Sequence, residues 1–148
     1  MTQPHIVLNW AAIAVATVAA FLIGWIWYGP LFGKPWAKAM GIKMDKKPDP
    51  AVMMKAMGLQ LLGLFLTTFV LAHTSQVWRA SVWGISGQDG SSMMYGCYAA
   101  LFTWIGFYVP LQLGKISWEM KPWKLFFINA GHDLVTLWVI AQILTHWR

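Results

Sequence analysis

The sequence predicts an all-α integral membrane protein, a four-helix bundle that forms one transmembrane domain over residues 1–148. Three observations predict this class. Of the 148 residues, 58% are apolar and only 11% are charged, whereas a soluble domain carries roughly 25% charged residues. The 11 tryptophans are typical of a chain anchored at two membrane interfaces. The apolar content excludes disorder, and the single cysteine excludes a disulfide scaffold.

The first predicted span covers residues 6–27, which contain no charged side chain. As a helix this segment is roughly 33 Å long, enough to cross a bilayer. No Lys or Arg precedes it, and it ends in Trp25, Trp27 and Tyr28 rather than at a small-residue cleavage site. We therefore expect a retained span and not a signal peptide.

A stripe of small residues follows one face of this span at a spacing of four. It consists of Ala12, Ala16, Ala20 and Gly24. Small residues let another helix approach closely, which favours association in lipid. We expect the packing partner to lie within the chain, with a second copy as the alternative.

Three further spans are predicted at residues 56–72, 93–113 and 125–145. Asp49 and Pro50 supply an N-cap and a first-turn proline for the helix of the second span. Ser91 ends a polar turn and caps the third, in which Pro110 predicts a kink. Residues 34–41 have a proline near the start and a glycine at the end, which indicates a short helix in the headgroup region.

The basic residues fall mostly on one side of these spans. Nine lysines lie in or beside the first and third loops, whereas only Arg79 and Arg148 lie on the other side. The positive-inside rule places those two loops in the cytoplasm and both termini outside. The net charge of +6 is thus a topology signal, and we expect no nucleic-acid partner.

Two parts of the chain resemble each other and suggest two duplicated helical hairpins in parallel orientation. Residues 28–31 read Tyr-Gly-Pro-Leu and residues 108–111 read Tyr-Val-Pro-Leu, each followed by Gly-Lys and a tryptophan. Parallel duplication relates the halves by an axis along the membrane normal. The other interpretation is shared composition, because hydrophobic segments that end in aromatic, Pro, Gly and Lys residues resemble one another.

A polar stripe in the fourth span predicts a pocket in the inner half of the bundle. Asp133 is the only acid within a span, about 13 Å from the cytoplasmic end of its helix. An intramembrane charge costs at least ~2.5–3.5 kcal/mol and so indicates a ligand or proton site, or a lock between helices. Other polar side chains at this depth are Asn129, His132 and Thr136 on the same helix face, with Gln60 and Tyr108 on neighbouring spans.

Three other histidines form a weaker candidate site near the outer face. His5, His73 and His146 lie at the ends of three spans, and imidazoles can ligate a metal or a porphyrin. No pair has a recognised ligand spacing, so we expect no metal and no cofactor. Common hydrolase, nucleotide-binding and metalloprotease motifs are also missing, which leaves catalytic residues unknown and disfavours an enzyme.

Several short motifs resemble a known family. They are Asn-Trp at 9–10, Leu-Phe-Gly-Lys at 31–34 and Asn-Ala-Gly at 129–131. With these motifs nearly the whole chain resembles the bacterial domain-of-unknown-function family 1761. The resemblance implies a small four-helix protein of the bacterial inner membrane, without an established activity. The family tends to have aromatic residues after Asn-Ala-Gly, where this chain has His132 and Asp133.

These observations lead to one favoured function and two alternatives. We expect a non-enzymatic binding or accessory subunit that associates through helix packing, as a homo-oligomer or in a larger membrane complex. The first alternative is a dimeric small-solute or proton-coupled transporter that uses the polar pocket. The second is a membrane enzyme that acts on a lipophilic substrate, with His132 or Asp133 as base and Tyr108 as proton donor.

Overall fold

The computed structural model describes residues 3–43, 45 and 49–148, and this part of the chain is helical with no strand. Four stretches are long and apolar enough to cross a membrane, in agreement with the predicted all-α four-helix class. The elements are α1 (Trp10–Ile26), η1 (Trp27–Leu31), α2 (Gly33–Met40), α3 (Pro50–Val77), η2 (Ala80–Trp83), α4 (Ser92–Thr103), η3 (Trp104–Tyr108), α5 (Val109–Ser117) and α6 (Trp123–His146).

Side-chain caps determine where three of the long helices begin. Asn9, Asp49 and Ser91 each accept a hydrogen bond from a backbone N–H in the first turn of α1, α3 and α4. The first helix therefore begins at Trp10 and not at residue 6. The helix of the second span begins at Pro50, as the predicted cap at Asp49 implies, and it includes Lys55 ahead of the uncharged residues 56–72.

The short interfacial helix predicted at residues 34–41 is present as α2. Gly41 ends it in the left-handed conformation, with a φ of 75°. At its start, a Cβ on Gly33 would lie 2.6 Å from the carbonyl oxygen of Tyr28. Glycine is therefore required where the chain turns from α1 into α2.

Two π-helical turns lie at the prolines of the first and third spans, one of them directly before Pro110, where the sequence predicts a kink. Pro30 lies inside the turn Trp27–Leu31, and Pro110 follows the turn Trp104–Tyr108 in the first turn of α5. A proline cannot donate the usual backbone hydrogen bond, and a wider turn accommodates this loss without opening the helix. The helical stretch Ser92–Ser117 consequently continues through Pro110.

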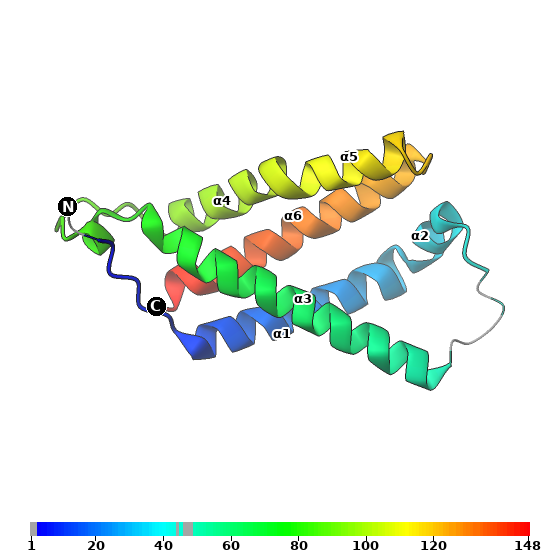
Figure 1. Ribbon diagram of the computed structural model, residues 1–148, viewed down its shortest axis with the longest axis horizontal. Helices are drawn as coiled ribbons and strands as arrows, with labels where there is room; N and C mark the ends of the chain where they lie inside the picture. Colours follow the sequence, from blue (N-terminus) through cyan, green and yellow to red (C-terminus); the bar gives the residue numbers. More distant parts are fainter. Residues whose placement is uncertain (1–2, 44, 46–48) are drawn as a thin grey trace.

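Helix α6 is the central element of the bundle. It packs against α1, α3 and α4, and half of its most apolar window is buried, against 22–28% in the other spans. Figure 1 shows both chain termini at one end, which we call the terminal end. The lysine-rich end, opposite, carries α2, the start of α3 and the turn between α5 and α6.

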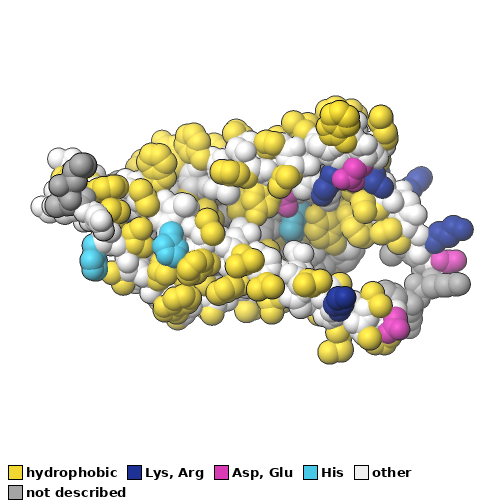
Figure 2. All heavy atoms as spheres, in the orientation of Figure 1, with side chains coloured by type: hydrophobic (Ala, Val, Ile, Leu, Met, Phe, Trp, Pro, Cys, Tyr) yellow, Lys and Arg dark blue, Asp and Glu magenta, His cyan; other side chains and the backbone are white. Residues whose placement is uncertain are grey.

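Charged and hydrophobic side chains occupy different parts of the surface along the length of the molecule. Figure 2 shows Lys and Arg side chains only toward the lysine-rich end of the face in view, whereas hydrophobic side chains cover the middle of the molecule. Lys46 and Lys47, which contribute to the predicted charge asymmetry, lie outside the described residues. An uncharged middle with charges at an end is the distribution expected for a protein that crosses a membrane.

Candidate functional site

The carboxylate of Asp133 lies at the centre of a polar network inside the bundle. Gln112 of α5 donates a hydrogen bond from Nε2 to Asp133 Oδ2 over 2.8 Å. The imidazole Nδ1 of His132 lies 3.2 Å from Asp133 Oδ1. Both carboxylate oxygens therefore have a polar partner before any ligand arrives, as a buried acid requires.

The network extends from this carboxylate to two other helical segments. Asn129 donates from Nδ2 to Gln112 Oε1 over 3.3 Å, and the Tyr28 hydroxyl donates to Asn129 Oδ1 over 3.0 Å. On the other side, His132 Nε2 lies 3.3 Å from the hydroxyl of Thr136. The predicted stripe on α6 is thus one connected set of hydrogen bonds, joined to α5 and to the π-helical turn after α1.

A cavity of about 200 Å³ opens beside this network, between α3 and α6. Asp133, His132 and Thr136 line it from α6, and Gln60 and Thr67 line it from α3. Its other lining residues are Gly63, Leu64, Tyr108 and Leu137. Figure 2 shows a hollow with a histidine and an acidic side chain in it, on the side toward the lysine-rich end. The cavity can hold a small organic group or several waters, since a water occupies about 30 Å³.

Asp133 also borders a second cavity, of about 530 Å³, toward the lysine-rich end. Asp133 and Tyr108 line both cavities, and the second one continues along α5 to Lys115, Trp118 and Glu119. The carboxylate therefore stands between the interior cavity and the lysine-rich end of the molecule.

Aromatic side chains hold the network in place. The indoles of Trp27 and Trp104 donate to the carbonyl oxygens of Ile128 and Ala130 over 3.0 and 2.8 Å. These carbonyls flank Asn129 in the chain, so the two π-helical turns are hydrogen-bonded to α6 on either side of Asn129. The ring of Tyr28 also lies 4.8 Å from that of His132.

The structure brings together all six residues predicted for the polar pocket, either in the network or in the cavity wall. The sequence analysis did not select two further members, Gln112 and Tyr28. Gln112 lies inside the predicted third span, where an amide is a signal of its own. Tyr28 occupies the position equivalent to Tyr108 in the proposed duplication, and this equivalence offered a second signal.

The small-residue stripe of α1 packs inside the chain. Ala12, Ala16 and Ala20 are fully buried, and α1 packs against α6. A Cβ on Gly24 would lie 3.5 Å from Nε2 of His132. The stripe therefore lets α1 approach α6, with Gly24 beside the polar side chain of His132, and its three alanines are not available to a second copy.

The three outer histidines are not brought together as a metal site. Among the described residues, no group of three or more His, Cys, Asp or Glu side chains could hold a metal ion. His73 and His146 each bind a carbonyl oxygen of their own helix, those of Phe69 and Gln142, over 2.9 Å. His5 has its backbone N–H bonded to the carbonyl of Val82.

Comparison with known proteins gives one match. A family model described as "Protein of unknown function (DUF1761)" matches residues 11–145. No curated protein matches the chain, and no solved structure does.

Proposed function

We propose that the chain, which belongs to the DUF1761 family of proteins of unknown function, is a non-enzymatic membrane protein that binds a small hydrogen-bonding ligand. The observation that carries this proposal is the Asp133 carboxylate, held by Gln112 and His132 beside a cavity of about 200 Å³. No Lys or Arg lines that cavity among the residues described. The chemistry of the wall therefore favours a ligand without negative charge.

His132 supports the proposed binding site by fixing the position of the Asp133 carboxylate. Its Nδ1 is engaged by Asp133 and its Nε2 by Thr136. These two contacts orient the imidazole and keep one carboxylate oxygen in place beside the cavity.

Native mass spectrometry of the protein in lipid nanodiscs tests the proposal. We expect wild-type protein to retain a small molecule at close to one per chain, and Asp133→Asn to lose it. Asp89→Asn is the matched control, because Asp89 is a carboxylate at the terminal end that borders none of these cavities. Equal retention by Asp133→Asn, or a wild-type chain that retains nothing, contradicts the proposal.

The proposal includes a location in the bacterial inner membrane, with the lysine-rich end in the cytoplasm and both termini outside. The asymmetry of the lysines supports this orientation. Single cysteines at Lys43 and Arg148, introduced in a Cys97→Ser background, test it in intact cells. An impermeant thiol reagent should label Arg148→Cys and spare Lys43→Cys, and the reverse pattern contradicts the orientation.

We also propose that the chain associates with a second copy or with a larger membrane complex. Supporting this, residues 51–63 of α3 are exposed on every side of the helix, and four spans enclose only a small interior. Cysteine crosslinking at Leu59 in native membranes should give a discrete product of higher mass. Recovery of monomer alone, at every crosslinker length, contradicts the association.

Transport is the second candidate function, favoured by one specific observation. Asp133 and Tyr108 line cavities on two sides of the network, as an acid in a proton or solute path does. Proteoliposomes should then show a flux that Asp133→Asn abolishes and Asp89→Asn leaves intact. Flux equal to that of empty liposomes removes this candidate.

A further inference from the structure

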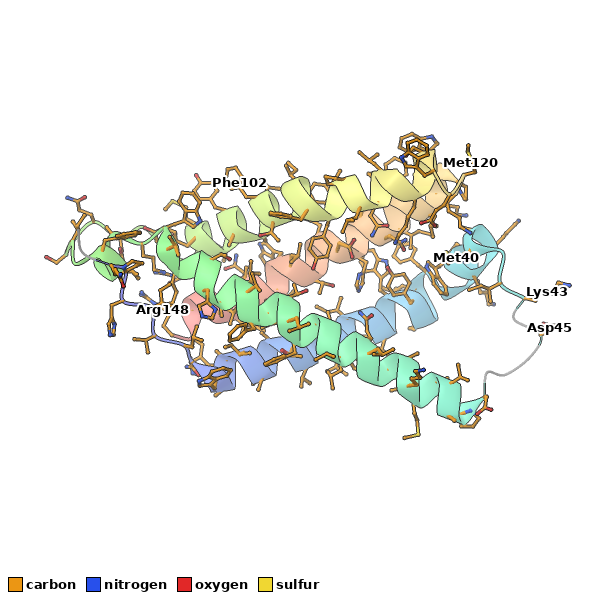
Figure 3. All side chains as sticks on the ribbon, in the orientation of Figure 1. Met40, Lys43, Asp45, Phe102, Met120 and Arg148 are labelled. Atoms are coloured by element: carbon orange, nitrogen blue, oxygen red, sulfur yellow. The ribbon has the colours of Figure 1, made fainter. Side chains whose placement is uncertain are left out.

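An apolar groove runs along the outside of the bundle between α3 and α4. Its volume is about 560 Å³, and Thr74 and Trp78 line it from α3. From the other side it is lined by Tyr98, Phe102 and neighbouring residues. Phe102 is 70% exposed, and Figure 3 shows it on α4 at the edge of the bundle. In a membrane this groove faces lipid chains and not water.

The groove and the polar cavity meet at two residues. Thr67 and Tyr108 line both, and their hydroxyl groups lie 3.1 Å apart. This hydrogen-bonded pair therefore stands at the boundary between a lipid-facing channel and the interior site of Asp133. A molecule with an apolar tail and a polar head fits the two spaces together.

The length of the groove matches one leaflet of a bilayer. Its α3 wall extends from Leu66 to Trp78, about 18 Å at the rise of an α-helix. The hydrocarbon core is about 30 Å thick, so half of it is about 15 Å. A tail in this groove would run from the polar cavity to the terminal end of the molecule.

The electrostatics of both spaces disfavour a negatively charged lipid headgroup. No charged side chain lines the groove among the described residues, and Asp133 and His132 are the ionisable groups that α6 contributes to the cavity. A phosphate head would enter a site with no Lys or Arg, next to a carboxylate, at a depth where an unpaired charge is costly. A hydroxyl or carbonyl head would instead find the Thr67, Tyr108 and Gln60 side chains as partners.

We propose that the ligand of the Asp133 cavity is a neutral lipid with a compact hydroxyl or carbonyl head. It enters sideways from the bilayer between α3 and α4 and leaves its tail in the groove. The head passes between Thr67 and Tyr108 and exchanges their mutual hydrogen bond for bonds to itself. This inference rests on the proposed binding function and assigns the chemical class of that ligand.

Photocrosslinking in nanodiscs tests the inference with three diazirine probes. They are an analogue of hexadecanol, one of hexadecyl phosphate with the same chain, and one of butanol, which has no long tail. The hexadecanol probe should label α3 and α4 along the groove, at least about tenfold more than the phosphate probe, because the phosphate finds no cationic partner. Equal labelling by the two long-chain probes overturns the inference.

Substitutions in α3 separate the groove from the cavity. Thr74→Trp fills the groove at an exposed position and should lower hexadecanol labelling about tenfold, with butanol labelling of the cavity unchanged. Val77→Trp is the matched control on the same helix, at an exposed position outside the groove and the cavity, and should leave both signals unchanged. If Thr74→Trp leaves hexadecanol labelling unchanged, the inference is overturned.

The butanol probe distinguishes the two levels of the proposal. Cavity labelling by butanol, lost in Asp133→Asn, with no groove labelling by hexadecanol, overturns the lipid class and leaves the binding function standing. Failure of both probes to label wild-type protein contradicts the inference and the proposed function together.

Discussion

In the described part of the molecule, an arginine and an aspartate lie inside the bundle, Arg79 at the terminal end and Asp133 in the other half, and their surroundings differ. Arg79 is 1% exposed, donates from Nη2 to the Thr145 carbonyl oxygen over 3.1 Å, and lies 4.5 Å from the centre of the Tyr95 ring. Burial lowers the pKa of its guanidinium, with Arg148 adding to the effect, but an arginine stays protonated at neutral pH. It lines none of the cavities around Asp133.

Asp133 has the opposite arrangement. Its oxygens are held by Gln112 and His132, yet open space adjoins it on two sides. We expect a buried group with no cavity beside it to hold helices together, and one with adjoining space to meet a ligand. Burial alone does not separate these two side chains, but the open volume beside Asp133 does.

Arg79→Ala gives the largest expected loss of stability. Removing this buried side chain should lower the free energy of unfolding by about 2–5 kcal/mol, because it leaves a cavity and an unpaired carbonyl at Thr145. Chemical denaturation in detergent measures the change. Arg148→Ala is the control, since the Arg148 side chain is 49% exposed, and it should stay within about 0.5 kcal/mol of wild type. If Arg79→Ala also lowers the free energy of unfolding by no more than about 0.5 kcal/mol, Arg79 does not have the structural role that distinguishes it here from Asp133.

Asp133→Asn should change ligand retention strongly and the free energy of unfolding little. The amide keeps the shape and a hydrogen bond with Gln112, so the free energy of unfolding should change by less than about 1 kcal/mol. Ligand retention should fall about tenfold or more, since the ligand loses its acceptor. Denaturation and native mass spectrometry of one preparation measure both quantities. A variant that unfolds as easily as Arg79→Ala would show that Asp133 is a structural lock.

Trp104→Phe tests the hydrogen bond that holds α6 next to the polar network, and it should lower the free energy of unfolding only slightly. It removes the indole hydrogen bond to the Ala130 carbonyl, and such bonds between membrane helices contribute about 0.6 kcal/mol on average. Trp138→Phe is the matched control, because Trp138 of α6 is 43% exposed. A cost for Trp138→Phe equal to that for Trp104→Phe would mean that the loss reflects side-chain size and not the hydrogen bond.

Asp89, a carboxylate in the loop before α4, extends the comparison to the pH dependence of stability. The side-chain hydroxyl and backbone N–H of Ser81 hydrogen-bond it and lower its pKa. Because the folded-state pKa is depressed, the stabilisation is present above the ordinary carboxyl pKa, roughly 4, and is lost as pH falls through the lower folded value. Carboxyl NMR titration should show the low pKa, and Ser81→Ala should raise it. An unchanged value in Ser81→Ala contradicts the assignment.

Local sequence signals were enough to predict most of the helical framework. The caps at Asp49 and Ser91, the short helix before Gly41 and the four apolar spans depend on neighbouring residues and on hydropathy. The start of the first helix was placed too early, because an uncharged run does not reveal that Asn9 begins the helix. The π-helical turn before Pro110 was not predicted, because a proline alone does not show how the preceding turn is hydrogen-bonded.

The candidate site could be predicted only in part. His132, Asp133, Asn129 and Thr136 share a helix face, and periodicity shows this without any neighbour. Gln112 and Tyr28 escaped selection because their depth can be read from the sequence but their direction around the helix axis cannot. The packing of one helix against another determines that direction.

The sequence by itself determined where the chain is apolar, where its helices are capped and which face of the last helix is polar, because each depends on residues within a few turns. Only the tertiary structure decided that Gly24 of α1 lies beside His132 on that polar face and that Gln112 meets Asp133. It also decided that α3 and α4 leave a groove between them. Crossing angles and gaps arise from the simultaneous packing of several helices, and no local stretch of residues encodes them.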